Sequence, residues 1–473
     1  MPLEEKQPWL RQLPSLSDLL ATEQAAAWLA LHPRPLVVEC LRSAVARVRE
    51  AVLAANAGAA PSVSAAAVLE RAGVLLGEAT TPHLRAAINA TGILLHTGLG
   101  RAVLPAAVVE GLTAELAGYV TLAVDRQTGE RAERDALIEY ILQELTGAEA
   151  ATVTNNNAAA TMLVLAALAA QREVIVSRGQ LIEIGGSFRL PEVMRQSQAR
   201  LVEVGSTNRT HLKDYRGAIT ENTAALMRVH PSNYRVVGFT QEVSLPELAE
   251  LAHSRGLVLI DDLGAGALVD LGPFGLPHEP TVQESLAAGA DVVLFSGDKL
   301  IGGPQAGIVV GRRPLVEKLR QHPLARAMRA DKTCLMLLER TLHLFRRPER
   351  LAEVHPTYRM LATSLEALRA RADAVVAEVA RTAPAVALRI RESVAFLGSG
   401  SLPTEAIPSI ELAVSVPGLS ATELARRLRE DPAAVFGRIE AGCVRLDMRT
   451  ITDAEGRVIA QTLSRLRPDE RAA

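Results

Sequence analysis

Short apolar runs alternate with longer amphipathic stretches through the middle of the chain. Apolar runs bounded by glycine, proline or polar residues predict buried strands at 151–154, 173–177, 200–204, 224–229, 257–262, 291–295 and 308–310. Helical stretches fall between them, at 158–170, 212–220, 245–255 and 284–288. Strands that are buried on both faces and alternate with helices are typical of a mainly parallel, doubly wound α/β sheet. Ligands of such sheets bind at the carboxyl ends of the strands, so we expect the functional site there.

The regions on either side have different patterns. Residues 1–80 are rich in alanine and leucine, and they predict a helical N-terminal domain with helices at 13–31, 35–55 and 64–77. Further helical patterns occupy 105–118 and 358–376, the second of them long and amphipathic. Beyond it, strands are expected at 410–416 and 444–447, and helices at 421–430 and 454–466. We therefore predict three domains: 1–80, a large domain at 81–344, and a smaller α/β domain at 345–473.

A lysine stands at the end of one predicted buried strand. The strand at 291–295 runs into Ser296-Gly-Asp298-Lys299, and a glycine-rich turn follows. An unpaired buried ammonium is costly, so Lys299 needs either a salt bridge or a covalent imine with a cofactor aldehyde. Burial lowers the pKa of a lysine and makes its amine a nucleophile. Ser296 is a candidate phosphate ligand, and this combination suggests a pyridoxal-phosphate lysine. A strand-end lysine in a tight turn is the alternative.

Two other strand ends suit the same cofactor. Asn155–Asn157 separates a strand from an apolar helix, and a helix start offers free N–H groups to a phosphate, so Asn156 and Asn157 are candidate ligands. A plain helix cap is the alternative. Asp261 and Asp262 end another strand, and a carboxylate there can pair with a protonated pyridine nitrogen. We favour Asp262, which is next to a glycine turn, and Asp261 is the alternative.

Several further residues are candidates for substrate binding. His230 ends a strand, in a loop whose polar groups can reach the substrate. Arg101 closes the glycine-rich stretch 88–101 and is a candidate anion ligand. Arg326 and Arg329 have helical spacing and are expected on one helix face, where paired guanidiniums suit a phosphate-bearing ligand. An exposed basic surface is the alternative. A ring-stacking residue is expected within 177–188, without a choice among its members.

Composition narrows the protein class. The 473 residues carry a net charge of −2, which does not indicate a general nucleic-acid binder, and 3% are aromatic. No apolar run approaches the roughly 20 residues of a membrane span, and the N-terminus has no signal-peptide pattern. The cysteines, at 40, 334 and 443, have neither metal-ligand nor disulfide spacing. We expect a soluble cytosolic protein without a metal site.

Taken together, these motifs resemble the bacterial selenocysteine synthase family, the L-seryl-tRNA(Sec) selenium transferases. The resemblance runs from about residue 10 to 465. The matching stretches are INATGILLHTGLGRA, NNNAAA, SRGQLIEIGGSFRLPEVM, EVGSTNRTHLKDY, HPSNYRVVGF, DDLGAG, SGDKLIGGPQAGI, RAMRADK, GSGSLPTEAIPS and LDMRT. One departure is Gly98, where asparagine is expected in many members, so no side-chain role is assigned at this position.

The resemblance implies a fold-type-I enzyme that uses pyridoxal 5′-phosphate and bonds it to Lys299. It implies that Asp298 assists catalysis and that Arg101, Arg326 and Arg329 hold the selenium donor, selenophosphate. The N-terminal domain would bind the selenocysteine tRNA, and the chains would form a ring of dimers with active sites at dimer interfaces. The reaction would convert L-seryl-tRNA(Sec) to L-selenocysteinyl-tRNA(Sec) through an aminoacrylyl intermediate. The alternative is a related ammonia-lyase that acts on a phosphorylated amino sugar acid.

Overall fold

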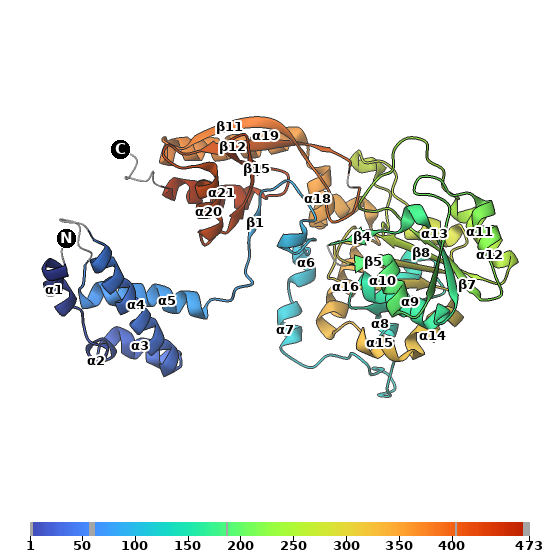
Figure 1. The fold of residues 1–473 in the computed structure, drawn as a ribbon, viewed down its shortest axis with the longest axis horizontal. Helices are drawn as coiled ribbons and strands as arrows, with labels where there is room; N and C mark the ends of the chain where they lie inside the picture. The colour runs from blue at the N-terminus through green and yellow to red at the C-terminus, as the bar shows by residue number, and fades with distance from the viewer. Residues whose placement is uncertain (1–2, 56–61, 186–187, 403, 467–473) are drawn as a thin grey trace. The chain divides into compact units, whose positions relative to one another are not determined.

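The chain forms two compact units, residues 1–86 and 87–473. The structure is a computed structural model, and it describes residues 3–55, 62–185, 188–402 and 404–466 (Figure 1). Each unit has its own core, so the two are described separately below. Among the described residues, no helix is both long and apolar enough to cross a membrane.

The first unit is helical, as predicted. Its helices are α1 (Leu3–Arg11), α2 (Leu16–Leu20), α3 (Glu23–Leu31), α4 (Arg34–Ala54) and α5 (Ala65–Thr80). The apolar faces of α4 and α5 supply most of a core that contains Val37, Leu41 and Val68. The single helix expected at 13–31 is wrong. Thr22 ends it, because its side chain accepts a hydrogen bond from the Ala25 N–H and caps a new helix.

The second unit is built on a seven-stranded sheet with the order β2-β10-β9-β8-β7-β3-β6. The strands are β2 (Ala150–Thr154), β3 (Glu173–Ser177), β6 (Arg200–Val204), β7 (Thr223–Val229), β8 (Val258–Gly264), β9 (Val292–Ser296) and β10 (Gly307–Gly311). All neighbours are parallel except β10, which runs antiparallel to both β2 and β9. The predicted α/β class and mainly parallel sheet are therefore confirmed.

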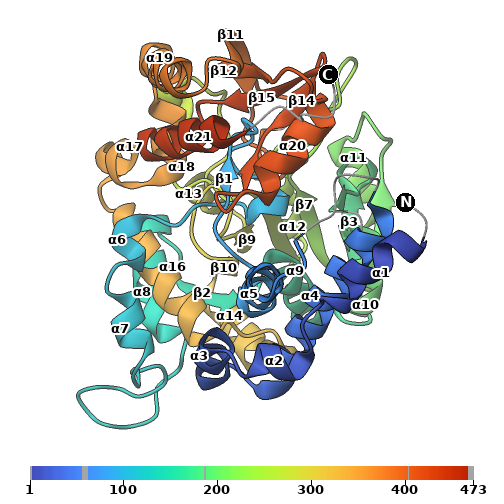
Figure 2. The ribbon, with the colours of Figure 1, turned by 90° about the vertical axis from the view of Figure 1, so that its left-hand side faces the viewer.

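Helices cover both faces of this sheet (Figures 1 and 2). One face packs against α8 (Ala136–Thr146), α12 (Leu245–Ser254), α13 (Val282–Ala287) and α16 (Lys332–Leu344). The other packs against α9 (Asn157–Ala169), α10 (Leu190–Gln196) and α14 (Arg313–Gln321). Along β9, Val293 and Phe295 face the first layer and Val292 and Leu294 the second. Because of this alternation, two consecutive side chains at the end of a strand point to opposite faces of the sheet.

A second sheet, antiparallel and four-stranded, has the order β11-β12-β15-β14. Its strands are β11 (Ala387–Ala395), β12 (Ile407–Ser415), β14 (Arg438–Glu440) and β15 (Cys443–Asp447). On one face it shares a core with α19 (Leu365–Thr382), α20 (Ala421–Glu430) and α21 (Asp453–Arg465), drawn in orange and red in Figure 2. The short strand β1 (Ile88–Asn89) pairs in parallel with β13 (Val435–Phe436), which ties residues near the start of this unit to its C-terminal part.

Two predicted helices are interrupted. Residues 105–118 form α6 (Ala106–Val109) and α7 (Leu112–Leu116), separated at Gly111, whose φ is +79°. The helix expected at 358–376 is divided into α18 (Pro356–Ala362) and α19. At this break, the buried guanidinium of Arg449 donates to the carbonyls of Met360 (2.6 Å) and Thr363 (3.0 Å), which ends α18. Arg449 therefore has a structural role.

Candidate active site

A pocket of about 430 Å³ opens at the carboxyl ends of the sheet strands, as expected for this fold. We call it the Lys299 pocket. It combines residues that are far apart in sequence, from the loop before α6, the start of α9, the ends of β7, β8 and β9, and residues 399–400. Of the predicted site residues, it brings together Arg101, Asn156, Asn157, His230, Asp262, Ser296 and Lys299.

Lys299 follows the end of β9 and is only 6% exposed. Burial lowers the pKa of its amine, an effect that the carboxylates of Asp262 and Asp298 oppose. A lowered pKa increases the fraction of neutral amine at physiological pH, and the neutral amine is the form that acts as a nucleophile or removes a proton. The burial and charge environment of Lys299 therefore fit the nucleophilic amine that the sequence predicts.

The two neighbouring aspartates of β8 point in opposite directions. Asp261 faces the α12 layer, and the guanidinium of Arg228 binds both of its oxygens at 2.7 Å. Asp262 lines the Lys299 pocket, where it accepts hydrogen bonds from Asn157 Nδ2 (2.9 Å), Thr161 Oγ1 (3.0 Å) and the Gly264 N–H (3.1 Å). Burial raises the pKa of the Asp262 carboxyl, and these hydrogen bonds oppose that rise. Only Asp262 is placed to meet a ligand in the pocket.

The start of α9 also lines the pocket, next to Asp262. Asn156 caps the helix, because its Oδ1 accepts from the Ala159 N–H at 2.9 Å. Asn157 uses its amide nitrogen on Asp262, and its Oδ1 is buried without a hydrogen-bond partner. The positive end of the α9 dipole therefore faces the pocket together with the hydroxyl side chain of Ser296. The cap is therefore observed, and the anion-binding role of this turn stays a prediction.

Arg101 and Asp298 form an ion pair beside the lysine, with 2.6 Å between Nη1 and Oδ2. The backbone of Arg101 is left-handed, with φ of +63°, a conformation that is strained for a residue with a side chain. Its Nε is buried without a partner. The preceding Gly98 belongs to the turn η1 (Thr97–Leu99), and a Cβ there would lie 3.3 Å from the His96 ring. The loop thus presents Arg101 as a cation with a free donor.

The loop after β7 adds two polar atoms without partners. His230 Nδ1 and Ser232 Oγ are both buried and make no hydrogen bond. Burial lowers the pKa of His230 to about 4, so its ring is neutral at pH 7 and its 3.7 Å approach to Glu279 is not an ion pair. A Cβ built on Gly264 would lie 3.3 Å from Ser232 Oγ and 3.9 Å from Lys299 Nζ. Ser232 Oγ and Lys299 Nζ therefore border the same small space.

Arg326 and Arg329 lie elsewhere on this chain. They border a separate hollow with Arg131, Arg134 and Arg320 and do not line the Lys299 pocket. The expected shared helix face is wrong, because α15 (Pro323–Ala327) ends before Arg329, which instead bridges Thr154 of β2. Among the described residues, neither arginine has an ion pair, and both are exposed. They are two free cations in a basic hollow.

Sequence reasoning missed several lining residues. Ser232 lines the pocket and lies in the motif that follows β7, but it was not singled out as a candidate. Thr161 does not line the pocket itself; it donates a hydrogen bond to Asp262, and this role depends on which face of α9 the fold turns inward. Ile182, Ile184 and Phe188 come from the stretch 177–188, where a ring-stacking residue was expected, and all three line the pocket. The sequence does not show that these apolar side chains form one wall, because Ile184 and Phe188 come together only when β4 (Glu183–Ile184) pairs with β5 (Phe188–Arg189).

These residues fit pyridoxal phosphate. The α9 N-terminus and Ser296 would hold the phosphate, the amine of Lys299 would bond to the aldehyde, and the buried carboxylate of Asp262 would pair with the ring nitrogen. The unpartnered Asn157 Oδ1 and Ser232 Oγ also need polar partners that a ligand supplies. No cluster of potential metal ligands occurs among the described residues.

Comparison with known proteins gives a consistent result. The family model described as "L-seryl-tRNA selenium transferase" matches residues 87–452, and "Selenocysteine synthase N terminal" matches residues 10–49. An L-seryl-tRNA(Sec) selenium transferase of Geotalea daltonii is 46% identical over 97% of this chain and 99% of its own length. The Geobacter sulfurreducens enzyme of the same name is also 46% identical, over 96% and 98%.

A solved structure shares the fold. D-glucosaminate-6-phosphate ammonia-lyase superposes with a TM-score of 0.56 at 23% identity, covering 80% of this chain and 95% of its own. At this identity the likeness concerns the fold alone. The ammonia-lyase alternative therefore gains a shared architecture and no shared activity.

Proposed function

This chain belongs to the L-seryl-tRNA selenium transferase family, and from this premise we propose that it converts L-seryl-tRNA(Sec) to L-selenocysteinyl-tRNA(Sec) with pyridoxal 5′-phosphate and selenophosphate. The observation that carries the proposal is the Lys299 pocket, in a chain that is similar to such transferases over nearly its whole length. Incubation with seryl-tRNA(Sec) and selenophosphate, followed by analysis of the aminoacyl product, tests it. Release of ammonia from a phosphorylated amino sugar acid, without selenocysteinyl-tRNA, would favour the alternative.

The bound cofactor supplies an aldehyde for the seryl amino group and an electron-poor ring that accommodates charge at Cα. The remaining chemistry belongs to the protein. The Lys299 amine removes the Cα proton, since its lowered pKa provides the neutral form. Asp262 holds the ring nitrogen in its protonated state. The serine hydroxyl takes up a proton and leaves as water, and the selenium of selenophosphate bonds to Cβ in its place while Cα regains a proton. A further water molecule attacks phosphorus, which breaks the P–Se bond and releases phosphate.

Asp298 has a supporting role in this scheme. Its carboxylate accepts a hydrogen bond from Arg101 and is 6% exposed, next to Lys299. It therefore holds the Arg101 cation at the mouth of the pocket and adds negative charge beside the amine. Lys299 is the better carrier of the proton that the departing hydroxyl needs, because Asp298 is already engaged as an acceptor.

We propose that the donor site combines residues from two copies of the chain. We assign the selenophosphate to Arg101, Arg326 and Arg329, yet the last two lie in a hollow of their own. A ring of dimers, with the active site between two copies, would bring the hollow of one copy to the Lys299 pocket of another. The two exposed, unpaired guanidiniums support this arrangement, since they suit an anion supplied from outside the subunit.

Replacing Arg326 with alanine is expected to raise the KM for selenophosphate about tenfold or more, with a smaller effect on the KM for seryl-tRNA, because a charge-assisted contact to the donor is lost. Steady-state kinetics with each substrate varied in turn measures both. Arg195→Ala removes another exposed arginine and is the control. Co-expression of Lys299→Ala and Arg326→Ala chains should restore part of the activity. Absence of such restoration, or a larger effect on seryl-tRNA, contradicts the shared site.

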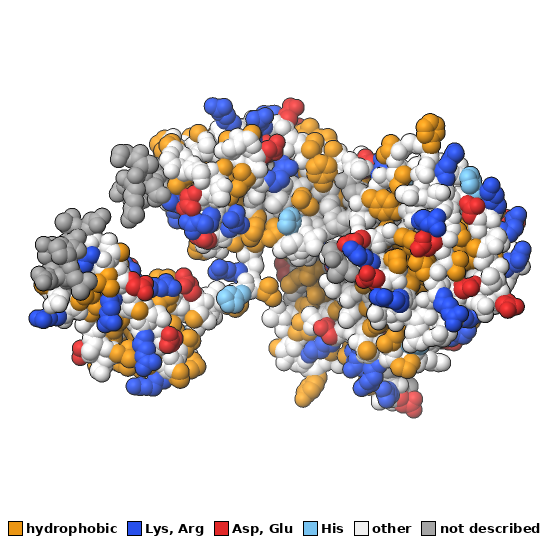
Figure 3. All heavy atoms as spheres, in the orientation of Figure 1, with side chains coloured by type: hydrophobic (Ala, Val, Ile, Leu, Met, Phe, Trp, Pro, Cys, Tyr) orange, Lys and Arg blue, Asp and Glu red, His pale blue; other side chains and the backbone are white. Residues whose placement is uncertain are grey.

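The helical unit is proposed to bind the tRNA. A reaction at one serine does not need this separate unit, and the family model for it matches residues 10–49. Basic and acidic side chains are interspersed on its visible surface, so a strong overall positive charge does not explain the binding (Figure 3). Since the proposed substrate is an aminoacylated tRNA, we also propose a cytoplasmic location.

Deletion of residues 1–86 is expected to weaken seryl-tRNA binding on the order of 10²-fold while cofactor binding stays unchanged, because the two units have separate cores. Filter binding with labelled tRNA and the visible spectrum of the cofactor measure the two effects. Full tRNA affinity in the shortened protein would refute the role of this unit. A lost spectrum would show instead that the larger unit depends on it for folding.

A further inference from the structure

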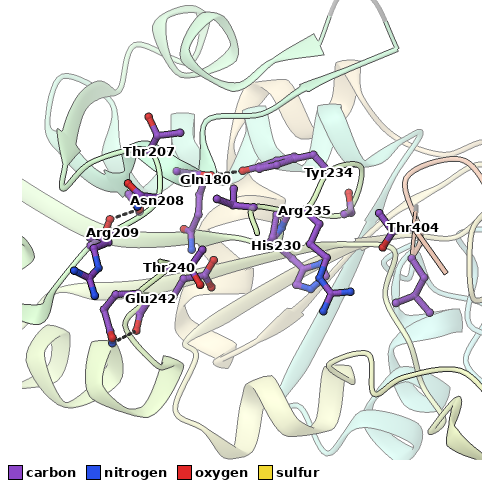
Figure 4. A pocket seen from close by; sticks show the side chains of 18 of the residues that line it. Gln180, Thr207, Asn208, Arg209, His230, Tyr234, Arg235, Thr240, Glu242 and Thr404 are labelled. Carbon is purple, nitrogen blue, oxygen red and sulfur yellow. Dashed lines mark hydrogen bonds between the residues drawn. The ribbon is translucent and has the colours of Figure 1, made fainter. Parts of the chain in front are cut away.

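A second cavity of about 330 Å³ adjoins the Lys299 pocket (Figure 4). His230 and Ser232 line both, so they form the boundary between them. The cavity lies among the loop after β7, the loop between β6 and α11 (Leu212–Ala218), and residues 277–279 and 404–405. Its volume is near the lower end of the range for small-molecule sites, about 300 to 1,000 Å³, which suits one nucleoside better than a helical stem. We call it the Tyr234 cavity.

The boundary holds two buried polar atoms without partners, Ser232 Oγ and His230 Nδ1. Ser232 is 1% exposed, so its hydroxyl cannot be satisfied by bulk water. It also borders the space next to Lys299 Nζ, as the position of a Cβ on Gly264 shows. A ligand that extends from the lysine into the second cavity would place its polar atoms here. Both unpartnered groups would then have partners.

The Tyr234 cavity is lined by both apolar and polar groups, and one of its walls is aromatic. Tyr234 donates its hydroxyl hydrogen bond to the Gly179 carbonyl, which fixes the orientation of its ring. The hydroxyls of Thr207 and Thr240 have no hydrogen-bond partner among the described residues. Asn208 uses its amide nitrogen on the Phe239 carbonyl at 2.7 Å, which leaves its oxygen available. A flat ring with several polar edges matches this combination of an aromatic face and free hydrogen-bonding groups.

Two arginines stand at the exposed side of the cavity. Figure 4 shows Arg209 with Glu242 on one side of the view and Arg235 with Tyr234 on the other, with His230 between them. Arg209 is exposed and makes no ion pair among the described residues. Arg235 contacts Glu405 at 3.1 Å, and its side chain remains 65% exposed. Cations at this rim are placed for a phosphate that leads away from the cavity.

We propose that the Tyr234 cavity binds the 3′-terminal nucleoside of the tRNA substrate. This inference rests on the proposed function, because the reacting serine is then joined through its ester to a ribose. With the serine Cα beside Lys299, the ester and the ribose hydroxyls lie only a few bonds away, at the Ser232 and His230 boundary. The base stacks on Tyr234, and Arg209 binds the phosphate that connects the next nucleotide. The cavity thereby distinguishes a serine ester of RNA from free serine.

Adenosine 5′-monophosphate is the probe, since tRNA 3′ ends carry adenosine. It is expected to bind the wild-type holoenzyme in calorimetry and to inhibit competitively against seryl-tRNA but not against selenophosphate. Tyr234→Ala should weaken its binding about tenfold, the usual effect of losing a stacking ring. Arg209→Ala should weaken the binding of the monophosphate and leave that of adenosine unchanged. Arg200→Ala, an exposed arginine at the other end of β6, is the matched control and should change neither.

Several results would overturn the proposal. Failure of the monophosphate to bind the wild type contradicts it, and so does equal binding of the monophosphate by the wild type and both variants. Inhibition by inorganic phosphate that equals inhibition by the nucleotide contradicts it as well. Retained cofactor absorption shows that Tyr234→Ala is folded; if it is lost, the adenosine and monophosphate comparison with Arg209→Ala decides. Failure of the proposed function is separate, because it appears as absent selenocysteinyl-tRNA synthesis by the wild type, whereas calorimetry still reports on the cavity.

Discussion

Replacing Lys299 with alanine is expected to abolish turnover and the visible absorption of bound pyridoxal phosphate together. Lys299 is the one lysine among the described residues that line the pocket, so no other amine there can bond to the aldehyde. The same amine is the proposed base at Cα, and loss of a general base lowers kcat roughly 10²- to 10⁴-fold. Absorption spectra and single-turnover assays of the purified variant measure both effects.

The control for this variant is Lys318→Ala, which removes an exposed lysine from α14. It should keep both the spectrum and the turnover of the wild type. A Lys299→Ala protein with an unchanged visible spectrum would contradict the assignment of the cofactor to this lysine. A protein with lost absorption but substantial turnover would leave the cofactor assignment intact and would require another base at Cα.

Replacing Asp262 and Asp261 one at a time with asparagine is expected to give opposite outcomes, although the two residues are neighbours. Asp262→Asn should lower kcat about 10²- to 10³-fold, because the ring nitrogen loses its charged partner. Asp261→Asn should keep kcat largely unchanged. It should lower the free energy of unfolding by about 3–5 kcal/mol, since Arg228 keeps a largely buried charge without its partner.

Turnover assays and urea unfolding of the same two proteins separate these effects. Each variant is the control for the other, because both remove one carboxylate from β8 and differ in the face of the sheet. A catalytic loss in Asp261→Asn with a normal Asp262→Asn enzyme would reverse the assignment. Equal catalytic losses in both variants would show that catalysis depends on the total negative charge at the end of β8 and not on which aspartate points into the pocket.

The strands of the central sheet could be predicted closely from the sequence. β3 and β6 begin and end at the predicted residues: β3 is an apolar run between Glu173 and Ser177, and β6 begins at Arg200 and ends before Gly205. The interruption between α18 and α19 could not be predicted. The break after Ala362 depends on Arg449, a residue from the far end of the chain that binds the carbonyl groups there. Local periodicity carries no information about such a partner.

The site shows the same division. Its motifs identified most of the lining residues, because the fold places strand ends side by side. The sequence did not show which of Asp261 and Asp262 faces the pocket. Alternation along a strand predicts that the two side chains point to opposite faces, and only the packing of the helices on the sheet shows which face each one takes. The location of Arg326 and Arg329 was beyond sequence reasoning, since spacing suggested a helix that ends before Arg329.

The pairing of β1 with β13 also has a consequence for how the chain folds during synthesis. The helical unit makes its contacts locally and can fold while translation continues. Residues 88–95 cannot, because their backbone partners are residues 396–397, 434–436 and 447, which leave the ribosome far later. The segment that leads to Arg101 therefore stays unpaired until nearly the whole chain has been made. A messenger truncated before residue 396 would yield a protein whose Arg101 loop has lost all of these backbone partners, so an ordered active site requires synthesis of the C-terminal part of the chain.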